Sequence, residues 1–331
     1  MNGSTTMAAV VVVAFTFAGC GRTMSLGSTS ETNVTAQRLA APASGELGPR
    51  VALTFDDLGA TSAAGADVSR HILKALADAK APAGVFANCK ELDPQALMLW
   101  HRAGATIGNH TGHHLSIDAQ DAAGTRAGAT WSRDVEDCDQ RLRTLVQKPV
   151  KYFRYPFLRY GSTEDRKRMG AAKLASLGYQ VAHVTAATSE WLLAQYYEAA
   201  LQRGDTALGE EIALGYVEHM VKTLATARQM AFAKVGRDVA QITLMHVNRL
   251  AADRLPAVLA ALRSAGWAFV SLEQALADPV YALPDVYVGG CGCSWLARIH
   301  PALRPQDDYA FGDDEDRIHA RFASRVDALN R

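Results

Sequence analysis

Two adjacent carboxylates follow an apolar run near the start of the folded part of the chain. Val51–Phe55 has the continuous apolar character of a buried strand, and Asp56 and Asp57 come directly after it. Burying two carboxylates at the mouth of a sheet costs free energy unless a cation or hydrogen-bond donors meet them. The pair therefore points to a metal site with a base beside it, although Gly59 fits a solvated loop equally well.

Histidines cluster in a second segment, Asn109–His114, which follows another apolar run. His110 and His114 are four residues apart, so on a helical turn both imidazoles would reach one ion, whereas His113 would point elsewhere. Two histidines and one carboxylate are a common ligand set for a catalytic zinc ion with open coordination positions. We therefore take Asp57, His110 and His114 as candidate metal ligands, although such histidine spacing also occurs by chance at surfaces.

Three further polar clusters follow apolar runs later in the chain. One run ends at Arg154, another is followed by Glu190 and Trp191, and a third contains Leu244 and ends at His246. Taken singly, Arg154 could be part of a structural ion pair, and His246 could be a hydrogen-bonded core histidine. Together, the five clusters each lie at the C-terminal end of an apolar run, where parallel barrels build their active sites.

The elements that must position these residues alternate along the chain. Short apolar runs occupy Val51–Phe55, Ala83–Ala87, Ala105–Gly108, Tyr152–Arg154, Gln180–Thr185, Ile242–His246 and Trp267–Ser271. Helical patterns occupy Ser69–Ala79, Pro94–Arg102, Trp131–Val146, Glu164–Leu177, Glu210–Lys234 and Ala252–Ser264. This alternation predicts crossover connections and an α/β fold, a distorted (β/α) barrel with about seven parallel strands.

Two regions exceed what a simple barrel needs. Leu192–Lys234 is longer than one crossover and predicts an extra helical insertion, which either walls the cleft or merely extends the helical layer. Residues 279–331 form a C-terminal extension. It contains the glycine-rich segment Gly289–Leu296 and a charged end, Asp307–Arg331, which fits a surface helix or a frayed tail. Trp295 in this extension would either stack on a sugar ring or cover the barrel end.

The N-terminus has the character of an export signal. Met7–Ala18 is apolar but short for a membrane span, and it ends in small residues before Cys20. This pattern is typical of a bacterial lipoprotein signal over residues 1–20, with Cys20 as the lipidated residue. An ordinary secretory signal cut near Gly19 is the alternative. Either signal exports the protein to the periplasm or the cell envelope. With the lipoprotein signal, the lipid anchor at Cys20 would be the only contact with the membrane. Residues 21–48 would then be a flexible tether.

Composition narrows the possible partners. The 331 residues include 34 basic and 34 acidic side chains, and this balance argues against general nucleic-acid binding. No glycine-rich phosphate-binding signature follows the first apolar run, which counts against a nucleotide. Besides Cys20, the cysteines are Cys89, Cys138, Cys291 and Cys293. They lack the paired spacing of zinc knuckles, so we expect disulfides or free thiols, and the sequence leaves the pairing open.

The five clusters in their order resemble the polysaccharide deacetylase family, carbohydrate esterase family 4, also called the NodB-homology domain. They read Thr54-Phe55-Asp56-Asp57, His110-Thr111-Gly112-His113-His114, Arg154-Tyr155-Pro156-Phe157, Ala187-Thr188-Ser189-Glu190-Trp191 and Leu244-Met245-His246. The resemblance covers roughly Pro49 to Ala277. It implies a NodB-like distorted barrel of seven or eight strands, which we place at residues 49–278.

The resemblance also implies roles for individual residues. Asp57, His110 and His114 would bind one divalent metal ion, for which zinc is the preferred candidate. Asp56 would be the general base, and His246 the general acid that protonates the leaving amine.

Other residues would support these groups. Arg154 would keep Asp56 ionised and oriented. The backbone N–H of Phe157 would help the metal to stabilise the oxyanion, and Leu244 and Trp191 would line a pocket for the acetyl methyl group.

The fourth motif departs from the family pattern. Ala187 stands where the family has an aspartate, and Glu190 stands at the second acidic position. Either Glu190 takes over as the supporting carboxylate, or His246 is tuned in another way. Phe157 replaces a tyrosine, which keeps the backbone N–H and loses a hydroxyl group.

The sequence therefore predicts a metal-dependent hydrolase that removes N-acetyl groups from peptidoglycan, a chitin-like polymer or an exopolysaccharide. A second reading keeps the fold but assigns another carbon–nitrogen amide bond or an acetyl ester as substrate. A third is an inactive, metal-holding lipoprotein that binds carbohydrate.

Overall fold

The computed structural model describes residues 48–59, 65–119, 127–290, 292, 294–300 and 312–328. The chain separates into two units after Ala40, and every described residue belongs to the second unit. The expected signal with Cys20, nearly all of the tether, Cys291 and Cys293 lie outside the described residues.

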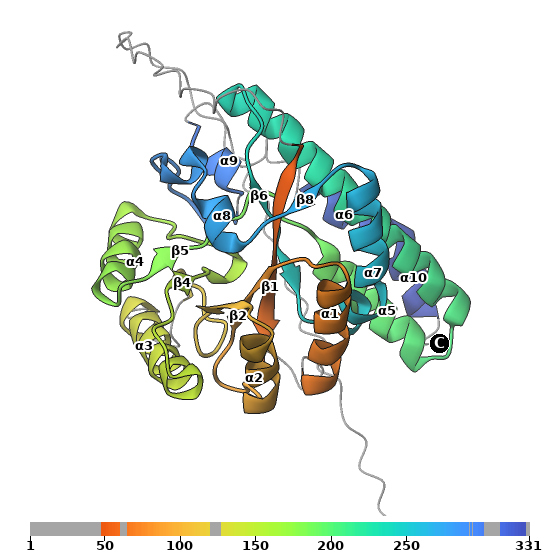
Figure 1. Ribbon diagram of the computed structural model, residues 1–331, viewed down its shortest axis with the longest axis horizontal. Helices are drawn as coiled ribbons and strands as arrows, with labels where there is room; N and C mark the ends of the chain where they lie inside the picture. Colours follow the sequence, from red (N-terminus) through yellow and green to blue (C-terminus); the bar gives the residue numbers. More distant parts are fainter. Residues whose placement is uncertain are drawn as a thin grey trace, which may run out of the picture. The chain divides into compact units, whose positions relative to one another are not determined.

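The described residues form an eight-stranded sheet in which every pairing is parallel. Its strands are β1 (Arg50–Leu58), β2 (Ala83–Ala87), β3 (Thr106–Asn109), β4 (Tyr152–Phe153), β5 (Gln180–Val181), β6 (Gln241–Ile242), β7 (Met245–His246) and β8 (Ala268–Phe269). The order is β5-β4-β3-β2-β1-β6, and β7 and β8 also pair with β1 (Figure 1). Strand β1 is therefore the central strand, with partners along both edges.

The two ends of this strand order are joined. After β5 the chain runs beside β6 and β7, where Ala186 forms a parallel bridge with Thr243. The N–H of Ala186 donates to the carbonyl of Ile242, and the N–H of Leu244 donates to the carbonyl of Ala186. This closure confirms the predicted distorted barrel. The count exceeds seven because the single strand expected over Ile242–His246 is split into β6 and β7.

Helices follow most of the strands. They are α1 (Ala66–Asp78), α2 (Pro94–Arg102), α3 (Ala127–Val146), α4 (Glu164–Ser176), α5 (Glu190–Gln202), α6 (Thr206–Val235), α7 (Arg249–Ser264), α8 (Leu272–Leu276), α9 (Trp295–Arg298) and α10 (Gly312–Ala328). Short 3-10 turns occupy Pro156–Leu158 and Pro279–Ala282. Side-chain caps fix several starts: Asp93, Thr163, Asp205, Asn248 and Ser271 each accept a hydrogen bond from a backbone N–H of the first turn.

The expected helical insertion is the pair α5 and α6, which pack against each other. Helix α10 packs on α5 and buries Ile318, Phe322 and Val326 in the main core, so this part of the charged C-terminal segment is a packed helix. Trp295 is also buried and stacks on His183, with ring centroids 3.6 Å apart, which favours the barrel-covering reading of this residue. No helix within the described ranges combines the length and apolar character needed to cross a bilayer.

Strand β1 forms the centre of the core. Val51, Leu53 and Phe55 are fully buried, and so is Ala52 on the opposite face of the strand. Phe55 contacts Trp100 of α2, with ring centroids 5.4 Å apart. A parallel strand covered on both faces needs such continuous apolar sequence, which explains why this segment could be identified as a strand.

We expect Leu53→Ala to lower the free energy of unfolding by about 2–5 kcal/mol, because it leaves a cavity beneath the central strand. Leu214→Ala is the matched control, since that side chain is 58% exposed on α6; its effect should stay within about 0.5 kcal/mol. Urea denaturation measures both, and equal effects would contradict this placement of the core.

Candidate active site

Asp56 and Asp57 lie within β1, at an irregularity in its pairing with β2. Between Phe55 and Leu58, β1 carries one residue more than its partner, as in a β-bulge. Asp57 has φ of 65°, in the left-handed region. Neighbouring residues of a regular strand face opposite sides, so the bulge and the left-handed turn bring both carboxylates toward one site.

His110 and His114 come together on a loop that follows β3, and the expectation that they share a helical turn is wrong. Thr111 and His114 have φ of 66° and 53°, so the backbone enters the left-handed region twice within this loop. The two imidazole rings lie 4.9 Å apart. The residues expected to meet do meet, but through left-handed backbone.

Asp57, His110 and His114 form a group that could hold a metal ion. Asp57 Oδ1 lies 3.7 Å from His110 Nε2 and 3.5 Å from His114 Nε2, and one donor atom of each residue lies within 4.8 Å of the others. Asp57 Oδ1 is buried and accepts no hydrogen bond. A buried carboxylate oxygen without a donor needs another positive partner, so the set fits a divalent cation.

The protonation of His110 suits a ligand. Its Nδ1 lies 2.8 Å from the backbone carbonyl oxygen of Arg154, which can only accept, so Nδ1 carries the proton and Nε2 offers its lone pair. Burial, together with the neighbouring His114, lowers the pKa of His110 to about 3. The imidazole is therefore neutral at physiological pH, as metal binding requires.

Arg154 is fully buried and holds Asp56 in place. Its Nη1 donates to both carboxylate oxygens of Asp56, at 3.2 and 3.4 Å. Its Nε donates to the carbonyl of Ala182, and its Nη2 donates to the hydroxyl of Thr54. Burial raises the pKa of Asp56, and Arg154 opposes that shift without cancelling it. Arg154 thus orients the carboxylate more effectively than it acidifies it.

His246 has Glu190 as its partner. The Nδ1 atom of His246 lies 2.7 Å from Glu190 Oε1, and Glu190 Oε2 accepts a hydrogen bond from Asn248. Burial alone would lower the pKa of His246, but the hydrogen bond and charge of Glu190 raise it to about 9. Of the two alternatives for the altered motif, the geometry favours Glu190 as the supporting carboxylate of His246.

Phe157 lies on a strained turn beside His114. Phe157 and Leu158 have φ of 58° and 49°. Phe157 is 54% exposed, and the centroid of its ring lies 4.4 Å from that of His114. Gly292 of the C-terminal extension approaches this turn so closely that a Cβ atom there would collide with the carbonyl oxygen of Phe157.

Backbone strain gathers at the candidate site. Of the seven non-glycine residues with positive φ in the described ranges, five belong to this region: Asp57, Thr111, His114, Phe157 and Leu158. Such conformations cost about 1–3 kcal/mol each and persist where the surroundings enforce them, commonly at functional sites. The amino-acid types give no signal for this strain.

Two residues expected to line the substrate pocket pack in or against the hydrophobic core. Leu244 is buried in the main core, and Trp191, in the first turn of α5, is partly buried against the same core. Their role in holding an acetyl group stays a prediction. Sequence reasoning also missed Asn248, Gly292 and Asp134, and the last of these accepts hydrogen bonds from the histidine loop.

Residues 45–182 match the family model described as polysaccharide deacetylase. This match agrees with the resemblance carried by the five motifs, and it spans less than half of the chain. It contains both aspartates, the histidine loop and Arg154, whereas Glu190 and His246 of the deacetylase fold lie beyond the matched residues. No curated protein matches the sequence.

Several solved structures are similar to this chain. A T48 deacetylase solved with substrate is 22% identical, with a TM-score of 0.45, over 69% of this chain and 91% of that one. PdaA of Bacillus subtilis, a family 4 carbohydrate esterase, is 19% identical with the same TM-score, over 69% and 80% of the two chains. A CE4 family pseudoenzyme from Bacillus anthracis is 13% identical, with a TM-score of 0.45, over 69% and 65%.

In the metal-free protein, we expect His246 to keep its proton up to about pH 9. Glu190→Gln removes the charge that opposes burial, so the pKa of His246 should fall below 6.5, its ordinary value. An NMR titration of the imidazole measures this change.

The same shift predicts how stability depends on pH. Because the folded pKa of His246 is raised, its contribution to stability is fully present below pH 6.5 and is lost as pH rises through about 9. Glu198→Gln, further along α5, is the matched control and should leave the titration unchanged. An unshifted His246 in Glu190→Gln would contradict the assigned pairing.

Proposed function

We propose that this protein is a metal-dependent deacetylase that hydrolyses N-acetyl groups on a cell-envelope or extracellular glycan. The observation that carries the proposal is the cation-binding geometry of Asp57, His110 and His114 beside the buried carboxylate of Asp56. The match of residues 45–182 to the polysaccharide deacetylase family model supports the same reaction class.

The metal proposed for this site is zinc, because one carboxylate and two imidazoles are a ligand set that zinc prefers. Bound there, it would polarise the acetamide carbonyl and lower the pKa of water. Asp57 supplies the negative ligand, and the carbonyl of Arg154 keeps the Nε2 atom of His110 free to bind.

Asp56 is the proposed general base. Its Oδ2 lies 3.7 Å from His110 Nε2, so the carboxylate borders the metal site without being needed as a ligand. Burial raises its pKa, which makes it a better proton acceptor than an exposed carboxylate. As the water oxygen bonds to the acetyl carbon, Asp56 takes the proton that the water releases.

His246 is the proposed general acid. Its raised pKa keeps it protonated at neutral pH. Glu190 holds the ring at Nδ1, so Nε2 is the nitrogen left to donate a proton. When the carbon–nitrogen bond breaks, His246 gives its proton to the amine nitrogen, and acetate is the second product. The neutral imidazole can then recover a proton from Asp56 through solvent.

The exposed ring of Phe157 and the expected export of the protein both favour a glycan as the substrate. The exposed Phe157 ring beside His114 offers an apolar face of the kind that packs on sugar rings, and its backbone N–H is the proposed donor to the oxyanion. A lipid anchor at Cys20 would hold the enzyme at the cell envelope, where acetylated polymers lie.

Asp56→Asn should reduce acetate release from N-acetylated chitooligosaccharides or peptidoglycan by about 10²–10⁴-fold, because the base is lost. Zinc content should stay unchanged, since Asp57 and both histidines remain. Asp67→Asn removes an exposed carboxylate on α1 and is the matched control, with full activity expected.

A chelator should abolish acetate release, and added zinc should restore it. No release from any N-acetyl or O-acetyl substrate by the zinc-loaded protein would contradict a hydrolase and favour the carbohydrate-binding alternative. Release from acetyl esters alone would assign the same site to ester hydrolysis.

A further inference from the structure

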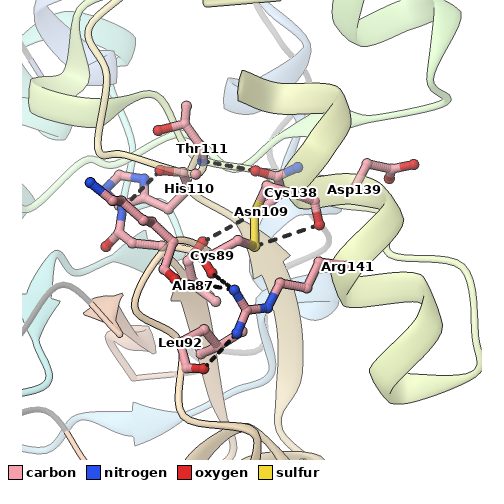
Figure 2. Close-up of a disulfide and its surroundings, with 12 residues drawn as sticks. Ala87, Cys89, Leu92, Asn109, His110, Thr111, Cys138, Asp139 and Arg141 are labelled. Carbon is pink, nitrogen blue, oxygen red and sulfur yellow. Dashed lines mark hydrogen bonds between the residues drawn. A yellow bond between two sulfur atoms is a disulfide. The ribbon is translucent and has the colours of Figure 1, made fainter. Parts of the chain in front are cut away.

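A disulfide links the region of the candidate metal site to helix α3. Cys89, two residues beyond the end of β2, is bonded to Cys138 in the middle of α3, and both residues are buried (Figure 2). The sequence left this pairing open. Its position matters because the loop that carries Cys89 lies directly against the loop that carries the two candidate histidine ligands.

The two loops are joined by hydrogen bonds that run residue by residue. Three successive residues of the first loop donate to three successive carbonyls of the second. The Asn88 side chain donates to the carbonyl of His110 (2.9 Å), the Cys89 N–H to that of Thr111 (3.1 Å) and the Lys90 N–H to that of Gly112 (2.9 Å). Displacement of the first loop would therefore pull on the backbone between the two ligands.

One face of helix α3 is bonded to both loops. Asp134, Cys138 and Arg141 are spaced by four and three residues, so their side chains share a side of the helix. The carboxylate of Asp134 accepts hydrogen bonds from the backbone N–H groups of Gly112 and His113, both at 2.9 Å. A Cβ atom at Gly112 would lie 2.6 Å from Asp134 Oδ1, so glycine permits this close approach.

Arg141 binds the first loop through its guanidinium group. Its Nη1 donates to the carbonyls of Cys89 and Lys90, and its Nη2 donates to the carbonyl of Leu92 at 3.0 Å (Figure 2). These bonds and the disulfide fix the same short segment to the same helix. The disulfide is the covalent member of this set.

We propose that the α3 face formed by Asp134, Cys138 and Arg141 positions the histidine ligands, and that reducing the Cys89–Cys138 disulfide weakens metal binding. This inference rests on the proposed metal site. Thr111 and His114 are held in left-handed conformations that persist only while their surroundings enforce them. Reduction by a thiol or phosphine adds two electrons and two protons, breaks the S–S bond and leaves two thiols.

The expected effect is a loss of affinity. Loss of groups that orient metal ligands typically weakens metal binding by about 10–100-fold. The disulfide orients the ligands through an intervening loop, so we expect a change of about tenfold. Cys89 and Cys138 are thus positioning residues that touch neither metal nor substrate.

The test measures zinc affinity by competition with a chromophoric chelator. It uses the full chain carrying Cys291→Ser and Cys293→Ser, so that these two cysteines cannot respond to reductant. The zinc Kd should rise about tenfold after treatment with a phosphine, with thiol titration confirming that the disulfide has opened. Cys89→Ser/Cys138→Ser should show the same rise without reductant and no further response to it.

Two measurements distinguish a local effect on the metal site from unfolding of the whole protein. In the metal-free protein, hydrogen exchange at the N–H groups of Lys90, Gly112 and His113 should accelerate on reduction, while amides of β1 stay protected. If the double-serine variant does not fold, Arg141→Met in the oxidised protein should raise the zinc Kd. Arg143→Met is its matched control, because that guanidinium binds Asp139 and the carbonyl of Leu177 instead.

The outcomes separate the two proposals. A zinc Kd that changes less than twofold after confirmed reduction overturns this inference alone, as does an Arg141→Met protein that behaves like Arg143→Met. An oxidised wild-type protein that binds no zinc overturns the proposed function and the inference with it.

Discussion

The rest of the site depends on one constraint, which is that two adjacent carboxylates sit at the C-terminal end of the buried central strand. A buried carboxylate needs a positive or hydrogen-bonding partner, and the two aspartates find different ones. Asp56 is met by the fully buried guanidinium of Arg154. Asp57 faces two imidazoles that are too far away to donate a hydrogen bond, and its buried Oδ1 stays without a donor. This division gives one carboxylate the surroundings of a base and the other those of a metal ligand.

Holding these groups together requires backbone that the side chains themselves do not favour. The bulge at Asp57, the loop residues Thr111 and His114, and the turn at Phe157 all use left-handed conformations. The fold enforces them from outside, through β2, helix α3 and the C-terminal extension, which approaches Phe157 at Gly292. The segments that contain the candidate site residues are therefore positioned by segments that contain none of them.

The fourth motif departs from the family pattern, and its Glu190 is the partner of His246. Glu190 begins α5, the first helix of the insertion, and its longer side chain reaches both His246 and Asn248. Arg154 is braced instead by the carbonyl of Ala182 and the hydroxyl of Thr54. Glu190 therefore supports His246, while Arg154 is held by the carboxylate of Asp56 and by neutral acceptors.

The sequence by itself determined the barrel class, most of the strands and the identity of the central residues, because continuous apolar runs and their polar ends are local features. It identified Asp57, His110 and His114 as partners but gave the wrong local geometry, since four-residue spacing predicts a helical turn and the chain forms a loop. Three features could be seen only in the tertiary structure. They are the Cys89–Cys138 disulfide, the hydrogen bond between Glu190 and His246, and the contact of α3 with the histidine loop. These depend on which segments meet in space, and the packing of the whole barrel settles that question rather than any local pattern.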